Sequence, residues 1–226
     1  MQTFSIPNFL SNDDLNLIGE VEGNKEPFFD RDGVYAGKIT STQQWIDINS
    51  DYIKFIQNKL NDIPELKNSA IDGAQILRAT NPYDVHSDWI VANNQVQLVD
   101  PAINIPTYTI VIPLIEGNYK TIVFNQGAEY NNFNDYKKTH SKINENPWIS
   151  HCSDYDWKKY CSHCNKEDQK YLTIKEIFHW KRGTLFAFHR KLFHCSANFD
   201  KSSKKAIVMW LSHEKELGPI VDTGAS

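Results

Sequence analysis

A histidine and an aspartate lie two positions apart in the stretch DVHSDW, residues 84–89. The surrounding sequence is typical of a β-strand, in which alternate side chains point to the same face, so His86 and Asp88 are expected to converge on one point. Imidazole and carboxylate groups are both common metal ligands. A chain with 8 histidines and 28 acidic residues can contain such a pair by chance. The pair therefore indicates a metal site only if a further ligand is present elsewhere.

The candidate for that ligand is His194, in the stretch TLFAFHRKLFHCSANF. It follows a strongly apolar predicted strand and a predicted tight connection. Two histidines and one carboxylate that leave open coordination positions are the signature of non-heme Fe(II) oxygenases. We therefore expect iron at His86, Asp88 and His194.

The elements that must position these residues are predicted to be mostly strands. Two helices are predicted, at residues 13–22 and 50–63, because capping residues precede apolar positions at helical spacing. From residue 70 onward, at least seven short runs rich in Ile, Val, Thr and aromatic residues are separated by turn signals. We expect one domain, residues 1–226, mainly β with flanking helices, in which residues 1–70 form a helical buttress for a β-sandwich or barrel.

Residues 128–170 interrupt the strand pattern and are predicted to form a long insertion, which is a candidate substrate lid. The insertion contains Cys152, Cys161 and Cys164, with His140, His151 and His163 among or near them. Three cysteines and one histidine are compatible with a tetrahedral structural zinc site that would order the loop. The alternative is a set of partly exposed free thiols.

Charge and hydropathy exclude several classes of partner. The formal net charge is −4, from 24 basic and 28 acidic residues, so no surface for nucleic acid is expected. The N-terminal stretch MQTFSIPNFLSNDD lacks the features of a signal peptide, and no run approaches about 18 apolar residues, so no membrane partner is expected. Four cysteines without a sign of export favour reduced thiols or a metal site over disulfides. We expect a soluble, cytoplasmic protein.

Several segments, taken in order, resemble the Fe(II)/2-oxoglutarate-dependent dioxygenases, nearest in pattern to the prolyl-4-hydroxylase-like branch. FSIPNFLSNDDLNLI resembles the opening helix of that family, and ILRATNPYDVHSDW resembles its strand with the pattern Tyr-x-x-His-x-Asp, with Tyr83 in the tyrosine position. YTIVIPLIEGNYKTIVFNQ resembles the paired strands that follow, although the usual double glycine is missing. WKRGTLFAFHRKLFHCSANF resembles the segment leading to the distal histidine, and SKKAIVMWLSHE resembles the final strand. The order and spacing of these pieces are more specific than any one of them.

The resemblance implies a double-stranded β-helix core of the jelly-roll, cupin-like type, with Fe(II) as metal and 2-oxoglutarate as cosubstrate. The distal carboxylate of 2-oxoglutarate needs a fixed cation, because an unpaired buried charge is very costly. The family spacing favours Lys204 for this role, and the adjacent Lys205 stays as the alternative. The implied reaction is hydroxylation of an unactivated C–H bond of an amino acid, peptide or small molecule, with release of succinate and CO2. Because Asp88 is present, no ligand position is vacant for a halide, while desaturation and ring closure stay open.

Other polar and aromatic residues near the motif carry weaker predictions. Arg78 either faces the pocket, where it would bind the cosubstrate or an anionic substrate, or lies on the surface. Trp89 either lines the substrate entrance or packs on the outer face. Arg190 is a candidate for closing over the substrate. Cys195 is expected to face away from the iron, in the core, because its neighbour His194 faces the iron.

Two other functional classes stay open at this point. A non-catalytic cupin-like metal-binding module would keep the strands and the histidines but would not need a lysine at the cosubstrate position. A metal-dependent isomerase or hydrolase of cupin type would usually carry further histidines or a glutamate near the first pair, which HSDWI lacks. The sequence determines neither the substrate nor the oligomeric state.

Overall fold

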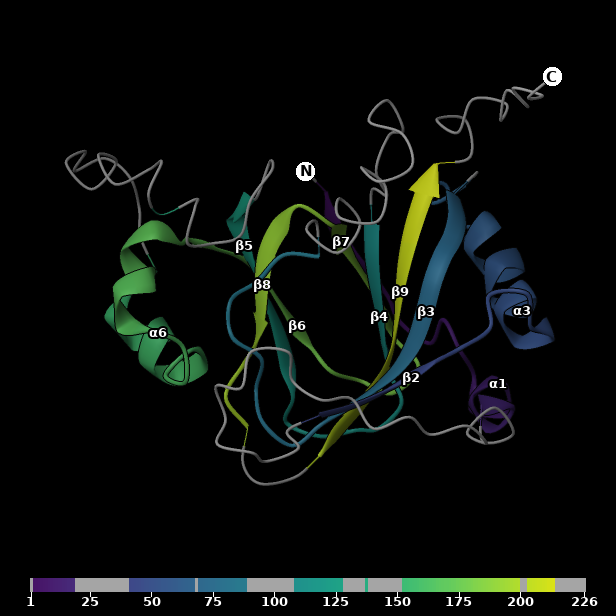
Figure 1. The fold of residues 1–226 in the computed structure, drawn as a ribbon, viewed down its shortest axis with the longest axis horizontal. Coiled ribbons are helices and arrows are strands. Elements are labelled where there is room, and N and C mark those ends of the chain that lie inside the picture. The colour runs from purple at the N-terminus through teal and green to yellow at the C-terminus, as the bar shows by residue number, and fades with distance from the viewer. Residues whose placement is uncertain are drawn as a thin grey trace, which may run out of the picture.

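The computed structural model describes residues 2–18, 41–67, 69–88, 108–127, 137, 152–199 and 203–213 (Figure 1). The helices in these ranges are α1 (Asn12–Asn16), α3 (Asp51–Asn61), α6 (Asp154–Tyr160) and the 3-10 helix η2 (Lys166–Tyr171). The strands are β1 (Thr3–Ile6), β2 (Ser41–Trp45), β3 (Ser69–Ala79), β4 (Tyr108–Pro113), β5 (Lys120–Gly127), β6 (Ile174–His179), β7 (Leu185–His189), β8 (Leu192–Ser196) and β9 (Lys204–His213).

The strands form two antiparallel sheets that face each other (Figure 1). One sheet has the strand order β1-β7-β4-β9-β3-β2, and the other has the order β6-β5-β8. Phe178 of β6 stacks on Phe186 and Phe188 of β7, with ring centroids 4.9 and 6.5 Å apart. The two sheets therefore share an apolar interior, as the layers of a jelly roll do.

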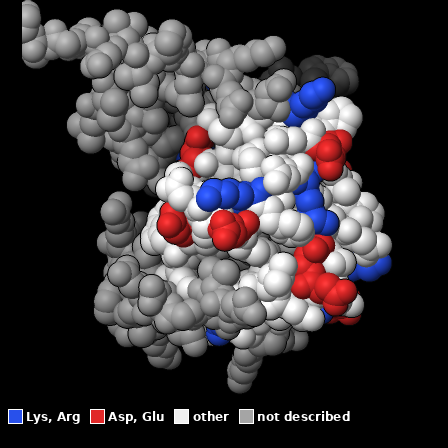
Figure 2. All heavy atoms as spheres, turned by 90° about the vertical axis from the view of Figure 1, so that its right-hand side faces the viewer, with Lys and Arg blue, Asp and Glu red and all other residues white. Residues whose placement is uncertain are grey.

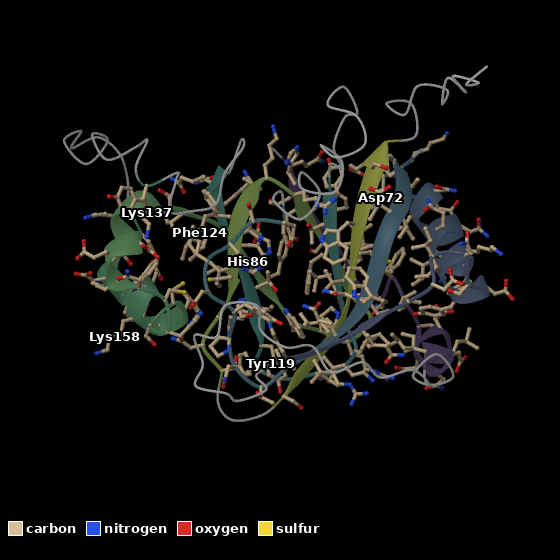
Figure 3. The ribbon with its side chains drawn as sticks, viewed as in Figure 1. Asp72, His86, Tyr119, Phe124, Lys137 and Lys158 are labelled. Atoms are coloured by element: carbon tan, nitrogen blue, oxygen red, sulfur yellow. The ribbon has the colours of Figure 1, made fainter. Side chains whose placement is uncertain are left out.

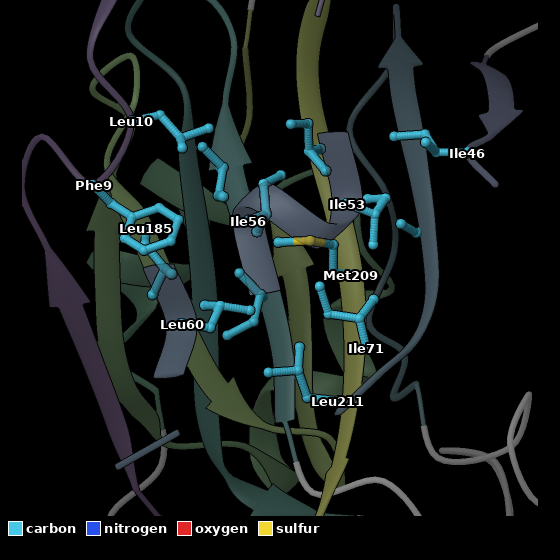
Figure 4. Packing of buried hydrophobic residues seen from close by; sticks show 14 of the residues in the cluster. Phe9, Leu10, Ile46, Ile53, Ile56, Leu60, Ile71, Leu185, Met209 and Leu211 are labelled. Atoms are coloured by element: carbon cyan, nitrogen blue, oxygen red, sulfur yellow. The ribbon is translucent and has the colours of Figure 1, made fainter. Parts of the chain in front are cut away.

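Helix α3 covers the outer face of the larger sheet, where most of the first core cluster lies (Figure 4). Ser50 caps this helix by accepting a hydrogen bond from the backbone N–H of Ile53 at 3.3 Å. Ile56 and Leu60 recur at helical spacing and are completely buried against the sheet. Residues 1–70 thus supply α3 close to its predicted bounds and α1, which is shorter than the predicted 13–22 helix, part of which lies outside the described residues. They also supply β1 and β2, the two edge strands of this sheet.

The described part of the 128–170 insertion packs against the outer face of the smaller sheet, on the left in Figure 1. Trp157 of α6, buried to 2 % exposure, lies in one apolar cluster with Ile122 of β5 and Phe193 of β8. Ser153 caps α6 through a 3.0 Å bond from the backbone N–H of Asp156. Residues 128–136 and 138–151, and any lid they form, lie outside the described residues.

Gly183 forms the turn that leads into β7. Its φ of 74° lies in the left-handed region, which side chains with a Cβ rarely adopt. Its carbonyl accepts from Leu10 N at 3.0 Å, and its N–H donates to Pro113 O at 2.9 Å. A Cβ at this position would collide with the Leu10 carbonyl. The turn therefore links β7 to the segments of Leu10 and Pro113 through backbone hydrogen bonds, at a position where a Cβ would not fit.

Charges of both signs are interspersed on the face that carries α3 (Figure 2). One ion pair there joins Lys59 Nζ to Asp14 Oδ2 at 3.0 Å. Among the described residues, no helix is both long and apolar enough to cross a bilayer.

Candidate metal centre

The segment that carries His86 runs antiparallel along the free edge of β8, in the space beside the smaller sheet (Figure 3). His86 N donates to His194 O at 3.0 Å, and His194 N donates to His86 O at 2.8 Å. A third bond runs from Ser196 N to Tyr83 O at 3.1 Å. The sequence predicted a full strand here, but the structure has a single bridge at His86 and a turn at Asp88. The backbone of β8 therefore positions the first histidine directly beside the second.

The side chains of His86, Asp88 and His194 converge. One ligand atom from each lies within 4.8 Å of the other two. His194 Nε2 is 3.7 Å from Asp88 Oδ2, and the two imidazole centroids are 4.3 Å apart. Asp88 and His194 are buried.

Both imidazoles are held in the same tautomer. His86 Nδ1 lies 2.7 Å from Asp84 O, and His194 Nδ1 lies 3.1 Å from Leu192 O. A carbonyl oxygen only accepts, so Nδ1 carries a proton in each ring and Nε2 is the nitrogen that can bind a metal. Backbone carbonyls orient metal-binding histidines in this way in many proteins.

Two neighbours fix Asp88. Thr109 Oγ1 of β4 donates to Asp88 Oδ2 at 2.6 Å, and Arg190 Nε donates to the backbone oxygen of Asp88 at 3.0 Å. Burial acts to raise the pKa of the Asp88 carboxyl, but His194, His86, Thr109 and Arg190 outweigh it and hold the pKa below its usual value. Asp88 is therefore a carboxylate at neutral pH.

Burial and the nearby His86 lower the pKa of His194 to about 4. Its imidazole is therefore neutral near pH 7. A neutral imidazole, a second one oriented alike and a carboxylate form a donor set that fits a divalent transition metal, and two histidines with one carboxylate are typical of non-heme Fe(II). The residues present thus fit the expected metal.

Lys204, the first residue of β9, lies in the same interior. Its side chain is buried and donates to Ser196 Oγ, two residues beyond His194 on the same face of β8. Its Nζ is 5.3 Å from the ring centroids of Tyr83 and Trp180. Burial lowers the pKa of Lys204 to about 7. In this environment a carboxylate partner would stabilise the charged, ammonium form of the lysine.

Lys205 and Arg78 lie on the opposite face of the larger sheet. They are cross-strand partners in the β3–β9 register, two residues along from the Ile76–Ile207 pair, which belongs to the core under α3. By alternation their side chains point to that side and away from the interior. The structure therefore does not bring the predicted alternatives Lys205 and Arg78 to the metal centre.

Arg190 is buried rather than poised over an opening. Only 4 % of the residue is exposed, and its guanidinium carbon lies 5.7 Å from the ring centroid of Trp210. Together with its bond to the backbone of Asp88, this packing makes Arg190 a support for the segment that carries Asp88. Trp89, the other predicted substrate residue, lies outside the described residues.

The cysteines group differently from the sequence prediction. In the described part of the chain, the second set of potential ligands within 4.8 Å of one another is His163, Cys164 and Cys195. Cys152 shares the apolar cluster beneath α6 but does not belong to that set. Cys195 points away from His194, into this outer layer, as predicted.

Sequence reasoning missed three residues that shape the interior. Thr109 supports Asp88, Ser196 contacts Lys204, and Trp180 packs over Lys204. Thr109 and Ser196 are single hydroxyl residues in apolar strands, and only the register of those strands aligns them with the site. One signal was available for Ser196, since alternation places it on the face of His194.

No known protein-family profile matches the chain, and no curated protein matches it by sequence. The non-heme α-ketoglutarate-dependent epimerase SnoN from nogalamycin biosynthesis is similar in structure, with a TM-score of 0.56 and 8 % identity, covering 93 % of this chain and 78 % of that one. HygX from Streptomyces hygroscopicus, solved with nickel and 2-oxoglutarate, gives a TM-score of 0.51 and 10 % identity over 94 % and 83 % of the two chains. A prolyl hydroxylase solved with a hypoxia-inducible-factor peptide from Trichoplax adhaerens gives 0.50 and 13 % identity over 95 % and 84 %. The likeness confirms the predicted fold, a mainly antiparallel jelly roll.

Proposed function

We propose that this chain is an Fe(II)- and 2-oxoglutarate-dependent oxygenase. In this proposal His86, Asp88 and His194 hold the iron, and Lys204 binds the distal carboxylate of 2-oxoglutarate. The observation that carries the proposal is the combination of an imidazole–carboxylate–imidazole set with a buried lysine, both in the interior enclosed by the two sheets. A metal-binding module without this cosubstrate would have no anionic ligand to pair with a buried lysine, and burying an unpaired ammonium is costly.

The spacing along β8 supports the pairing of these roles. Ser196, which contacts Lys204 Nζ, lies two residues beyond His194, a separation of about 7 Å along a strand. A five-carbon dicarboxylate can bridge a gap of this order, with its keto acid end at the metal and its far carboxylate at the lysine. Tyr83 and Trp180 shield the lysine, so its ammonium is attractive only to a ligand that enters the interior.

The protein's own groups would orient and protect the reaction. Fe(II), when bound, supplies the activation of dioxygen that is coupled to decarboxylation of 2-oxoglutarate to succinate and CO2. Thr109 and Arg190 hold Asp88 in place, and the carbonyls of Asp84 and Leu192 hold the imidazoles with Nε2 available. The aromatic interior excludes water from the space between the sheets.

We infer hydroxylation of a C–H bond as the reaction, and an amino acid, peptide or small molecule as the substrate class. Asp88 supports this inference, because a carboxylate in the third ligand position leaves no vacancy for a halide. The neighbour SnoN is described as an epimerase, so the fold accommodates other outcomes. The mass of the product distinguishes them, since hydroxylation adds one oxygen atom and epimerisation adds none.

The test has two stages. Under anaerobic conditions, Fe(II) and 2-oxoglutarate together should give a weak visible absorption band that neither gives alone, and under air the loaded protein should release succinate. His194→Ala should abolish both signals, whereas His179→Ala, at an exposed histidine of β6, should keep them. A band that is absent from the properly loaded protein would contradict the proposal. A screen of amino acids and peptides for stimulated succinate release then identifies the substrate class.

A further inference from the structure

Behind the metal centre, four potential metal ligands from two distant segments meet on the outer face of the smaller sheet. Cys161, His163 and Cys164 come from the turn after α6, and Cys195 comes from β8. Cys161 Sγ lies 3.8 Å from Cys195 Sγ, and Cys164 Sγ lies 3.2 Å from His163 Nε2. The ligand atoms of His163, Cys164 and Cys195 are all within 4.8 Å of one another, and Cys161 lies outside this set but contacts Cys195.

We propose that Cys161, His163, Cys164 and Cys195 form a structural zinc site. This site is separate from the iron site and does not depend on the proposed oxygenase activity. It also differs from the set expected from sequence, because Cys195 of the core strand takes the place of Cys152.

Two of the separations in this cluster match edges of a tetrahedron around zinc. Zinc–sulfur bonds of about 2.3 Å and zinc–nitrogen bonds of about 2.0 Å give tetrahedral edges of about 3.8 Å between two sulfurs and about 3.5 Å between sulfur and nitrogen. The Cys161–Cys195 separation of 3.8 Å agrees with the first edge, and the Cys164–His163 separation of 3.2 Å is close to the second.

The local backbone brings the first three ligands together. Helix α6 ends at Tyr160 with Cys161 as its C-cap, and Cys164 N donates to Cys161 O at 2.9 Å, which closes a tight turn. The turn directs the Cys-x-x-Cys side chains to one side, a spacing common in structural zinc sites. The turn faces the outer surface of β8, where Cys195 projects.

The imidazole of His163 is oriented for coordination through Nε2. Its Nδ1 lies 2.7 Å from Asn198 Oδ1, a contact of the kind that fixes zinc-binding histidines. Its Nε2 also lies 3.0 Å from Tyr83 O. Zinc at Nε2 would replace that contact, and Tyr83 O would still accept from Ser196 N at 3.1 Å. Coordination therefore leaves no buried carbonyl without a partner.

The site has the burial and charge that zinc requires. Cys161, Cys164 and Cys195 are buried, with 0 %, 7 % and 1 % exposure. Binding of Zn²⁺ converts the three thiols to thiolates, releases three protons and forms four bonds without any redox change, and the site then carries one net negative charge. Zinc would tie the turn after α6 to the strand that carries His194. It would thereby restrict the motion of β8, which carries His194 on its opposite face.

The first experiment uses the full chain, both as wild type and as the His86→Ala variant. In the His86→Ala variant the iron site is disabled. After zinc loading and gel filtration, elemental analysis of this variant should find one zinc ion per chain. X-ray absorption at the zinc edge in that variant should show three sulfur ligands at about 2.3 Å and one nitrogen at about 2.0–2.1 Å. A ligand shell of nitrogen and oxygen alone would overturn the proposal, because that zinc would sit elsewhere.

The second experiment uses matched cysteine variants. In the His86→Ala background, Cys161→Ser combined with Cys164→Ser should reduce bound zinc from one per chain to near zero. Cys152→Ser changes a buried cysteine of the same cluster and should leave the zinc content unchanged. Retention of zinc by the double variant, or its loss in Cys152→Ser, would contradict the assigned ligands.

The third experiment needs no variant and so does not depend on folding of altered chains. In the native wild-type protein, alkylation should spare Cys161, Cys164 and Cys195 until a chelator removes the zinc, and the melting temperature should then fall by roughly 5 °C or more. An intact mass two hydrogens lighter than the reduced chain, traced to a Cys161–Cys195 bond, would instead show a disulfide and overturn the proposal.

Discussion

His194 and Cys195 are consecutive residues of β8 whose side chains lie on opposite faces of the smaller sheet. His194 points to Asp88 in the interior, at 3.7 Å, and Cys195 points to Cys161 in the outer layer, at 3.8 Å. This follows from the pleat of a strand, which sends neighbouring side chains to opposite faces. One strand thereby serves both proposed metal sites, so changes on either side of it can be separated by experiment.

Lys204→Ala should weaken 2-oxoglutarate binding strongly. Removing one partner of a buried charge pair costs about 2–5 kcal/mol, which is a loss of at least about 30-fold in affinity. Titration of the anaerobic iron–2-oxoglutarate absorption band measures it. Lys205→Ala is the matched control, because Lys205 lies on the other face of the sheet and should leave the affinity within about twofold. Equal losses in the two variants would refute the assignment of Lys204.

The affinity for 2-oxoglutarate should fall as the pH rises above neutrality. The pKa of Lys204 in the free protein is lowered to about 7 by burial, and a carboxylate partner would raise it. Binding above pH 7 therefore takes up a proton, and the affinity should drop by up to about tenfold per pH unit there, while staying level just below it. In Lys204→Arg the guanidinium stays protonated, so its binding curve should be flat over the same range. A wild-type affinity for 2-oxoglutarate that rises with pH over this range would contradict the prediction.

Thr109→Val should weaken iron binding without unfolding the protein. The hydroxyl of Thr109 donates to Asp88 Oδ2 at 2.6 Å, and valine keeps the shape while removing the donor. Loss of such a support typically costs about 10- to 100-fold in metal affinity. Competition with a fluorescent chelator measures the iron affinity.

Thr184→Val serves as the control for that change, since the Thr184 hydroxyl is buried and has no hydrogen-bond partner in the described structure. It should leave iron binding unchanged. If Thr109→Val also binds iron normally, Thr109 does not position the carboxylate.

Arg190→Met should lower both stability and iron affinity. Arg190 Nε donates to the backbone oxygen of Asp88 at 3.0 Å, so its loss frees the segment that carries this carboxylate. A hydrogen bond from a charged group contributes about 1.5–3 kcal/mol. Thermal melting and iron titration give the two readouts.

Arg182→Met separates the two effects. Arg182 Nε also donates to a backbone carbonyl, that of Leu114 at 3.2 Å, but its other contact is Asn12 near the N-terminus. This variant should melt earlier and still bind iron like the wild type. Normal iron binding by Arg190→Met would remove Arg190 from the supporting residues.

Gly183→Ala should destabilise the fold. A left-handed backbone with a Cβ costs about 1–2 kcal/mol, and the new Cβ also meets the Leu10 carbonyl. The melting temperature of a chain of this size should fall by roughly 2–8 °C. Gly73→Ala is a milder comparison, because that glycine lies outside the left-handed region and its Cβ would approach the Trp210 ring at 3.2 Å. A smaller loss at Gly183 than at Gly73 would argue against strain at the turn.

Local pattern was enough to predict the elements and the residue types of the site. Capping at Ser50 with apolar positions at helical spacing predicted α3, and short β-branched runs predicted the strands of the jelly roll. The order of the histidine–aspartate pair and the distal histidine singled out His86, Asp88 and His194, and the structure brings them together. The caps and β-branched runs are local, so propensity and periodicity carry them, whereas His194 lies far along the chain from Asp88 and the resemblance to a known family linked it to the pair.

Tertiary structure alone decided which face of each strand looks inward. Alternation placed Arg78 with Ile76, but only the packing of α3 shows that this face is the outer core and that Lys205 shares it. The meeting of Cys161 with Cys195 spans 34 residues and depends on how the insertion docks on β8. Side-chain periodicity states which residues share a face, whereas burial of that face is settled by long-range packing against elements elsewhere in the chain. For that reason the sequence indicated the proposed iron ligands, whereas the contacts of Lys204 and of the cysteines emerged only from the folded chain.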